Sequence, residues 1–582
     1  MPASRVNISG VFHPRRDALR RSLLPITLDT LCLVFFYLAL VTPNRISWMM
    51  PLSFVYFPLE GLLFGLVLLA LPERAAFGFR GLMALLLGAG IIFKLADMAA
   101  YLAFARPFNP VLDAYLLGDA MNLLTGAIGR LGALVTAALI IVLALLIFVL
   151  AFIVLGRLRA LLLIAPGKSA TWLSMGLLVW LALSLSPLHR SSKSFYELMA
   201  LHVNDTFSGL ADIRYFRSVV SVDAYADTPG DALFQAIRGK DVLLVFIESY
   251  GRTVLDNPDF ASHVRPVLEQ ANIDLAAHAI FARSAYLTSP TVGGISWLAH
   301  GTALSGLWIN SQVRYDALVR SRRQTLNSLF RRAGWRTVAV MPAITQAWPE
   351  GDYFGYDQIY TATDLGYQGE PFNWVTMPDQ YTLSAFQALE RRPGPRRPVM
   401  AEMALISTHA PWTPLPTMVD WAQVGDGSIF TAQANAGESP EVVWKEETRI
   451  REQYRLSVEY ALADLVSYAI TYGDDNLVIL MFGDHQPAPL VTGDTDNRDV
   501  IVHLIARDPK VMDAVQGWHW SDGMLPAADA PVWRMDEVRD RIISAFSAPA
   551  ESRSEEDGQE KIQTSVQPQD QTVDTGSASR SQ

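Results

Sequence analysis

Charged residues are scarce in this sequence, and cysteine is almost absent. Asp, Glu, Lys and Arg make up 18% of the 582 residues and hydrophobic residues 51%, whereas soluble domains carry about 25% charged residues. This deficit excludes a disordered chain and argues against one that is soluble throughout. The net charge of −10, with no basic domain, argues against nucleic-acid binding. Because Cys32 is the one cysteine, a disulfide framework, a CxxC zinc site and an iron–sulfur cluster are excluded.

Charge and hydropathy divide the chain near residue 190. Residues 1–190 carry 15 Lys and Arg against 7 Asp and Glu, a net +8, so the remaining residues carry −18. The contrast predicts an α-helical membrane domain over 1–190, a linker over 191–238 and a catalytic domain over 239–548. Residues 549–582 are polar, rich in Ser, Gln, Glu and Asp, and are predicted to form a disordered tail.

Five apolar stretches of the first part are long enough to cross a bilayer, which takes about 17–25 residues. Lys and Arg lie before the first stretch, between the second and third, and between the fourth and fifth. The positive-inside rule places these regions in the cytoplasm and everything after residue 190 outside. A helix over 105–130 is expected to lie at the outer interface, with an ordinary connector as the alternative. The predicted spans are 22–42, 51–72, 81–104, 131–155 and 170–188.

Ionisable residues fall inside these predicted spans, namely Asp29, Glu60, Lys94 and Asp97. Charges in lipid are costly and usually face a bundle interior. Lys94 and Asp97 are three residues apart on a helix, so they can pair. We interpret them as an ion pair that locks helix packing, and a route for substrate is the alternative.

The second part has the pattern of an α/β domain. Continuous apolar runs rich in Val and Ile are typical of strands buried on both faces of a parallel sheet. Helical patterns between them predict a doubly wound, mostly parallel sheet with helices on both faces, whose site lies at the carboxyl ends of the strands. The predicted strands are 241–247, 335–341, 399–407 and 476–482, and the predicted helices are 317–333 and 443–472.

Acidic and imidazole side chains follow three of these strands. Glu248 comes directly after the first strand, Asp484 and His485 follow the last, and His409 follows 399–407. Because the strand ends share one edge of the sheet, these side chains are expected to converge. Two carboxylates and one imidazole nitrogen suit zinc or manganese, with magnesium as a further candidate. The sequence therefore predicts a divalent metal site at Glu248, Asp484 and His485.

The order of the motifs VLLVFIESYG, STHAPW and LVILMFGDHQ resembles the sulfatase-like branch of the alkaline phosphatase superfamily. With five preceding spans, the chain is similar to the lipoteichoic acid synthase and phosphoglycerol transferase group. The resemblance implies an alkaline phosphatase-like domain with a threonine nucleophile that also binds the metal. This group places a glycine ten residues after the nucleophile, and Thr291 has Gly301 at that spacing. Thr288, which precedes Ser289 and Pro290, is the alternative.

The resemblance also implies three substrate-binding residues: His409, Trp348 and His300. His300 lies late in the expected nucleophile helix, and a packing role is its alternative. The group has an aromatic–asparagine–arginine cluster for the headgroup, whereas this sequence has Trp348 followed by Pro349 and Glu350. This departure leaves the headgroup open.

The function implied by the resemblance is that of a multi-pass phosphotransferase of the bacterial inner membrane, with a periplasmic catalytic domain. It would transfer phosphoglycerol from phosphatidylglycerol to a glycan or glycolipid through a phospho-threonine. Phosphoethanolamine transferases commonly carry disulfides in this domain, which has no cysteine here, so glycerophosphate is favoured. The alternatives are phosphoethanolamine transfer, a sulfatase or phosphodiesterase-type hydrolase, and a non-enzymatic scaffold. The sulfatase motif C/S-x-P-S-R is absent.

Overall fold

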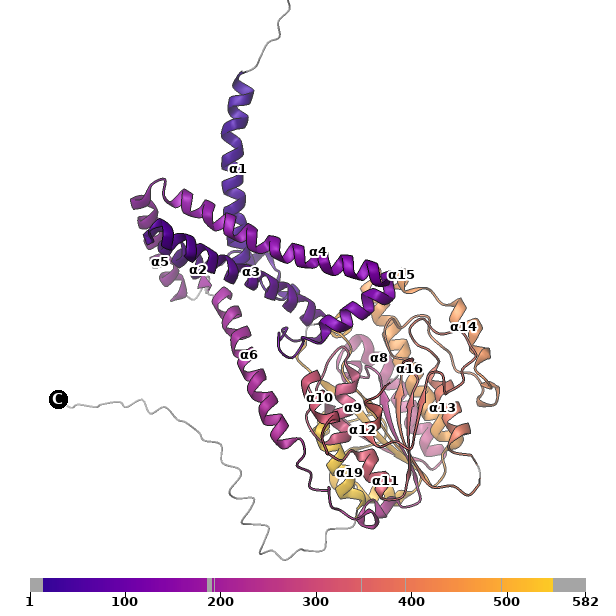
Figure 1. Ribbon diagram of the computed structural model, residues 1–582. Coiled ribbons are helices and arrows are strands. Elements are labelled where there is room, and N and C mark those ends of the chain that lie inside the picture. Colours follow the sequence, from indigo (N-terminus) through magenta and orange to yellow (C-terminus); the bar gives the residue numbers. More distant parts are fainter. Residues whose placement is uncertain are drawn as a thin grey trace, which may run out of the picture.

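The computed structural model joins a group of N-terminal helices to an α/β domain (Figure 1). The predicted disordered tail, 549–582, lies outside the residues that the structure describes. Those residues are 14–185, 191–192, 194–346, 348–392, 394–493 and 495–547.

Within the described residues, five helices occupy the part of the chain predicted to lie in the membrane. Two of them, α3 and α4, are long and apolar enough to cross a membrane. Ile26–Val41 of α1 and the whole of α2 are shorter apolar helices. A membrane anchor is therefore supported, and five crossings remain a prediction. The bounds are α1 Pro14–Val41, α2 Leu59–Ala70, α3 Glu73–Phe104, α4 Leu116–Leu162 and α5 Pro166–Ser184.

The segment 105–130 is part connector and part helix. Ala105 has φ 52°, a left-handed conformation that ends α3, and Arg106 pairs with Asp113 at 2.6 Å within the turns that follow. Helix α4 starts at Leu116, and Gly129, with φ 75°, separates its first turns from the apolar stretch. A helix is thus present only from Leu116 onward, and the residues before it form the connector; its location at the outer interface stays a prediction.

Lys94 and Asp97 both hold helices together, but the pairing predicted between them is wrong. The Lys94 Nζ donates to the carbonyls of Ala39 and Leu40 at 2.8 and 3.0 Å, while Asp97 accepts from Asn44 Nδ2 at 2.6 Å. Ala39 and Leu40 lie in the last turn of α1, where carbonyls have no partner within the helix and carry the negative end of the helix dipole. The Lys94 ammonium group thus has these carbonyls as its acceptors, while Asp97 is engaged by Asn44 and by His202 Nε2, which lies 3.2 Å away.

The predicted linker over 191–238 contains a long helix, α6 (Ser194–Val219). It packs against α1 and α3 at one end and against α10 (Gln312–Val319) at the other, and so contacts both parts of the molecule (Figure 1).

Beyond α6, Asp223 accepts two hydrogen bonds from Arg539 Nη2, each 2.7 Å long, and both side chains are buried. Burial alone raises the pKa of Asp223, but Arg539 outweighs it and holds this pKa below its usual value.

Asp223→Ala is expected to lower the free energy of unfolding by about 3–5 kcal/mol, because it removes the buried carboxylate on Arg539 Nη2 and leaves the guanidinium only its bond to Asp540. Since the pKa of Asp223 is depressed, its contribution is present above the unfolded-state pKa and is lost as the pH falls through the folded-state pKa. Thermal unfolding in detergent measures the change. Asp227→Ala, at an exposed position nearby, is the control, and equal loss in both variants would contradict the prediction.

The α/β domain is built on a sheet in which nine strands are described, in the order β10-β4-β9-β8-β3-β7-β5-β6, with β11 beside β4. The five strands from β8 to β6 are parallel, and β9 and β10 run antiparallel to their neighbours. All four predicted strands are present in the parallel part, so the predicted fold class is confirmed. The bounds are β3 Asp241–Ile247, β4 Phe281–Thr288, β5 Arg336–Met341, β6 Gln358–Thr361, β7 Val399–Leu405, β8 Leu477–Gly483, β9 Asp499–Ala506, β10 Ser521–Asp522 and β11 Val532–Arg534.

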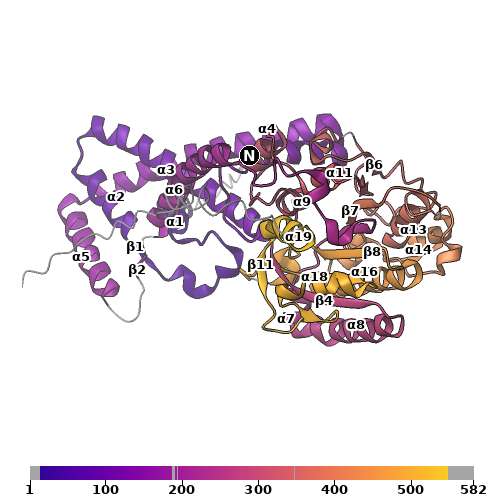
Figure 2. The same ribbon diagram turned by 90° about the horizontal axis from the view of Figure 1, so that it is seen from below.

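Helices cover both faces of this sheet (Figure 2). Along β3, Leu243, Val245 and Ile247 pack on the face of α8 and α16, and the residues between them pack on the face of α9 and α11. The predicted helix over 317–333 is two helices, because the Thr325 side chain caps a new one by accepting from the Ser328 N–H at 3.1 Å. The remaining bounds are α7 Thr253–Asp256, α8 Pro258–Ala277, α9 Ser296–Ser305, α11 Leu326–Arg332, α12 Gly351–Phe354, α13 Asp379–Leu389, α14 Thr431–Ala436, α15 Pro440–Val443, α16 Glu447–Tyr472, α17 Pro489–Thr492, α18 Pro509–Ala514 and α19 Val538–Phe546.

Candidate active site

Glu248, Asp484 and His485 converge at the carboxyl ends of β3 and β8. These strands pair in parallel, with Ile247 opposite Gly483, so the residues that follow leave the sheet side by side. One ligand atom from each residue lies within 4.8 Å of the other two. The His485 Nε2 is 3.2 Å from Glu248 Oε1 and 3.7 Å from Asp484 Oδ2. The convergence predicted from the sequence is confirmed.

The backbone around this cluster fixes its orientation. The N–H groups of Ser249 and His485 donate to Asp484 Oδ1 at 2.8 and 2.7 Å. The His485 Nδ1–H donates to the Gln486 carbonyl at 2.8 Å, which leaves Nε2 as the nitrogen that faces the carboxylates. Such outer hydrogen bonds are what hold metal-binding side chains in place.

The electrostatics of the cluster favour a bound cation. Burial, together with the neighbouring Glu248 charge, raises the pKa of Asp484 to about 7. Burial lowers the pKa of His485, but the charges of Asp484 and Glu248 outweigh it and raise this pKa to about 9. Burial raises the pKa of Glu248, but the His485 charge outweighs it and holds this pKa well below its usual value. Two buried carboxylates and one imidazole nitrogen thus need a compensating positive charge, and their donor atoms fit Zn²⁺ or Mn²⁺.

Two hydroxyl groups contact this cluster: Ser249 Oγ donates to Glu248 Oε1 at 3.0 Å, and Ser296 reaches two members of the cluster. The Ser296 Oγ donates to Glu248 Oε2 at 2.9 Å and lies 3.2 Å from His485 Nε2. Ser296 is the first residue of α9, where the free N–H groups and the helix dipole favour an anion such as a phosphate. The sequence prediction did not include this residue.

Thr291, the nucleophile predicted from the sequence, lies five residues before the start of α9. Gly293, Gly294 and Ile295 have φ angles of 75°, 149° and 64°, so the backbone makes a turn that is incompatible with a right-handed helix until Ser296. The Thr291 Oγ1 donates to the Gly294 carbonyl at 2.8 Å, within the same turn. Of these two hydroxyl groups, that of Ser296 contacts the cluster, whereas that of Thr291 is bonded within the turn.

The spacing that selected Thr291 also fits Ser296. Gly306 comes ten residues after Ser296 and has φ 66°, the left-handed conformation that ends α9. Gly301, ten residues after Thr291, lies inside the helix instead. Gly306 therefore ends the helix that begins at Ser296, whereas Gly301 does not end a helix. The alternative Thr288 donates to Asp499 Oδ1 at 2.8 Å, at the end of β4.

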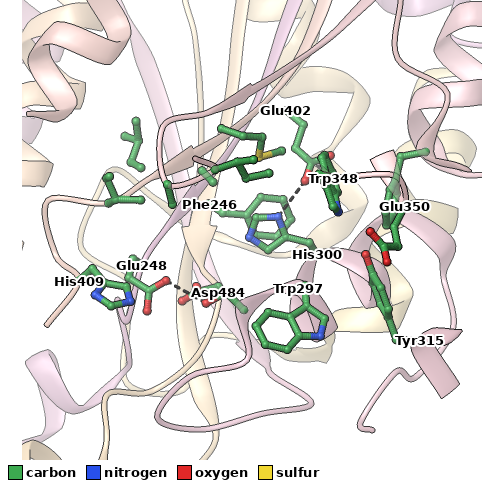
Figure 3. A pocket seen from close by; sticks show the side chains of 18 of the residues that line it. Phe246, Glu248, Trp297, His300, Tyr315, Trp348, Glu350, Glu402, His409 and Asp484 are labelled. Carbon is green, nitrogen blue, oxygen red and sulfur yellow. Dashed lines mark hydrogen bonds and ion pairs between the residues drawn. The ribbon is translucent and has the colours of Figure 1, made fainter. Parts of the chain in front are cut away.

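A cavity of about 680 Å³ adjoins the cluster (Figure 3). All three predicted substrate-binding residues, His409, Trp348 and His300, line it, as do Glu248, Asp484 and Ser296. The His409 Nδ1–H donates to the Ala410 carbonyl at 2.6 Å, so Nε2 is its nitrogen available to a substrate. Tyr115 and Asp119, at the start of α4, complete the wall.

His300 is held by a buried carboxylate that the sequence prediction missed. The His300 Nδ1 is 2.8 Å from Glu402 Oε1, and its ring stacks on Phe246 with centroids 3.7 Å apart. Glu402 also accepts from the Tyr356 hydroxyl and, at 3.2 Å, from Asn327 Nδ2. The signal that could have identified it is an acidic residue in the middle of the predicted strand 399–407, because a charge buried in a strand needs partners.

No family model and no curated protein matches this chain. Among solved structures, it is similar to the lipoteichoic acid synthase LtaP from Listeria monocytogenes, with 14% identity over 59% of this chain and 79% of that one, and a TM-score of 0.35. It is also similar to the phosphoglycerol transferase GacH from Streptococcus pyogenes, in complex with sn-glycerol-1-phosphate. The identity is 12% over 57% of this chain and 91% of that one, and the TM-score is 0.34. A third similar structure is the C-terminal periplasmic domain of EptC from Escherichia coli, in complex with Zn. The identity is 15% over 47% of this chain and 74% of that one, and the TM-score is 0.32. Because these TM-scores are below 0.5, the comparisons carry no argument about function, which rests on the geometry of the site.

Proposed function

We propose that the protein is a metal-dependent phosphotransferase that moves a phospholipid headgroup, with its phosphate, to a glycan or glycolipid outside a bacterial inner membrane. One observation carries this proposal. The Ser296 hydroxyl, at the first turn of α9, lies 2.9 and 3.2 Å from two members of a buried Glu–Asp–His cluster. Such a pairing of hydroxyl, helix N-terminus and metal-type donor set suits the attack of a nucleophile on a phosphodiester.

Glu248, Asp484 and His485 would hold one divalent cation, Zn²⁺ or Mn²⁺ or else Mg²⁺. When bound, it would neutralise charge on the phosphoryl oxygens and favour the ionised form of the nucleophile. The chain itself supplies the hydrogen-bond acceptor of the nucleophile, since Ser296 Oγ already donates to Glu248 Oε2.

Two transfer steps follow from this geometry. Ser296 Oγ attacks the phosphorus and passes its proton to Glu248 Oε2, the phosphorus–oxygen bond to diacylglycerol breaks, and His409 Nε2 protonates the departing oxygen. The headgroup phosphate is then esterified to Ser296. An acceptor hydroxyl attacks the same phosphorus and gives its proton to His409, while Ser296 Oγ leaves and recovers its proton from Glu248. A threonine intermediate at Thr291 was predicted from the sequence, and we propose Ser296 in its place.

The position of the cavity suits a donor that stays in the bilayer. Tyr115 and Asp119 contribute to its wall from the start of α4, one of the two helices long enough to cross a membrane. A lipid headgroup near this helix would reach Ser296 while its acyl chains remain in lipid. Phosphatidylglycerol is the donor that the sequence resemblance implies.

Purified protein mixed with labelled phospholipid and Mn²⁺ or Zn²⁺ is expected to release diacylglycerol. Mass spectrometry of protein trapped with donor but no acceptor is expected to place the headgroup phosphate on Ser296. Absence of release from every common phospholipid would contradict the proposal. Turnover of soluble aryl phosphodiesters at the rate found for lipid would favour the hydrolase alternative.

Metal affinity is expected to rise about tenfold per pH unit from pH 7 to 9 and to level off above. The pKa of His485 is raised to about 9 in the metal-free site, so below that pH a cation must displace the proton from Nε2. At pH 8, where Asp484, with its pKa of about 7, is ionised, each bound ion should release about one proton. Calorimetry in buffers of different ionisation enthalpy measures this release. An affinity independent of pH would contradict the assignment of His485 as a ligand.

A further inference from the structure

One end of the cavity, away from the metal cluster, is an aromatic box (Figure 3). The Trp348 ring lies 5.8 Å from the Phe354 ring and 6.2 Å from the Tyr356 ring, and the Tyr315 ring lies 6.3 Å from that of Phe354, between centroids. Glu350 stands next to Tyr315 at this end, whereas Glu248, Asp484 and His409 stand at the other (Figure 3). We call the group of Tyr315, Trp348, Glu350, Phe354 and Tyr356 the aromatic subsite.

The charge of the cavity is strongly negative. Among the described residues that line it, six are Asp or Glu, two are His, and none is Lys or Arg. Glu248 and Asp484 belong to the metal cluster, and Glu402 already has three hydrogen-bond partners. The carboxylates that remain for a ligand are those of Asp119 and Glu350, together with Asp316, which already accepts from Gln312 Nε2 at 2.8 Å.

A cavity with these walls favours a cation over a neutral polyol. The faces of Trp and Tyr rings attract an ammonium group, and the attraction grows where water is excluded. Carboxylates in the same wall add to it. A glycerol headgroup offers only hydroxyl groups and would leave these charges without a counter-charge.

A negative side chain stands close to Trp348 in the sequence: Glu350 follows it by two residues. The structure places both residues in the cavity wall. A headgroup near Trp348 therefore meets a negative side chain.

We propose that the aromatic subsite binds the ammonium group of an aminoalcohol headgroup, so that the donor is a lipid of the phosphatidylethanolamine type and not phosphatidylglycerol. This inference rests on the proposed function and names its donor. The phosphate lies at Ser296 and the metal cluster, and the ammonium lies at Glu350 and Trp348. The bonds that form and break are those given above, and Ser296 carries phosphoethanolamine between the two steps.

Donor choice is tested with the full-length protein, loaded with Zn²⁺ or Mn²⁺, in the absence of acceptor. Diacylglycerol release is measured from phosphatidylethanolamine, phosphatidylcholine and phosphatidylglycerol, each as the sole donor. We expect kcat/KM to be about tenfold or more higher for an aminoalcohol lipid than for phosphatidylglycerol. A preference for choline over ethanolamine would keep the ammonium subsite and make its ligand quaternary. Equal or faster release from phosphatidylglycerol overturns the inference and leaves the proposed function intact, whereas no release from any donor overturns both.

Glu350→Gln is expected to lower kcat/KM for the aminoalcohol donor by about tenfold and to leave release from phosphatidylglycerol within about twofold. Asp352→Asn is the matched control, because Asp352 is exposed and does not line the cavity. Thermal unfolding checks that both variants fold. An equal loss with both donors overturns the inference, because Glu350 would then support the site without recognising ammonium. A changed KM for an amino-sugar acceptor, with donor release unchanged, also overturns it.

Discussion

Ser296→Ala is expected to lower kcat for diacylglycerol release by about a thousandfold or more. Ser296 Oγ is the hydroxyl that contacts both Glu248 and His485, at 2.9 and 3.2 Å. Alanine keeps α9 and the cluster but removes the atom that forms the bond to phosphorus. Single-turnover release from labelled lipid measures the loss, and mass spectrometry of the trapped protein should show no headgroup adduct on the variant.

Thr291→Val and Thr288→Val are the matched controls for this prediction. The Thr291 hydroxyl donates to the Gly294 carbonyl and that of Thr288 to Asp499, so each hydroxyl supports a turn and neither donates to Glu248, Asp484 or His485. Both variants are expected to retain turnover within about tenfold. Loss of the adduct in Thr291→Val, together with its persistence in Ser296→Ala, would restore the threonine predicted from the sequence.

Glu248→Gln and Asp484→Asn are each expected to lower kcat/KM by about a thousandfold, with loss of the bound cation. The cluster offers three donor groups, and an amide in place of a carboxylate removes the charge that binds the metal. Glu248→Gln also removes the acceptor of the Ser296 proton. Metal content by mass spectrometry, measured beside turnover, separates loss of metal from loss of the acceptor.

The fold is expected to survive these two substitutions. Glu248 and Asp484 follow the last residues of β3 and β8 and take no part in the apolar packing of either face. Circular dichroism and thermal unfolding of the metal-free proteins test this expectation. Asp496→Asn, at an exposed position, is the control and should keep both metal and turnover. Full metal content in Asp484→Asn would remove this residue from the metal site.

The parallel strands and the metal-type cluster were predictable from the sequence because their signals are local. Strands buried on both faces show as continuous apolar runs, and β3, β5, β7 and β8 all fall on such runs. Residues directly after parallel strands share an edge by the geometry of the sheet, so Glu248 and Asp484 had to approach each other. The antiparallel strands β4 and β9 were missed because Ser284 and His503 interrupt their apolar runs. In the structure these two bond each other at 2.6 Å inside the core.

Which hydroxyl faces the cluster was decided only by the tertiary structure. Thr291 and Ser296 each have a glycine ten residues later, and spacing cannot tell a glycine inside a helix from one that ends it. The left-handed turn through Ile295 sets the start of α9, and a non-glycine residue in that conformation has no local sequence signal.

Partners from distant segments were equally hidden from the sequence. Lys94 bonds carbonyls of another helix, and Glu402 binds groups from three other segments. The cavity takes Glu350 and Tyr115 from parts of the chain far apart. Periodicity and strand order report what each segment buries, whereas the choice of partner for a polar group depends on which distant groups the packed chain brings within hydrogen-bond distance.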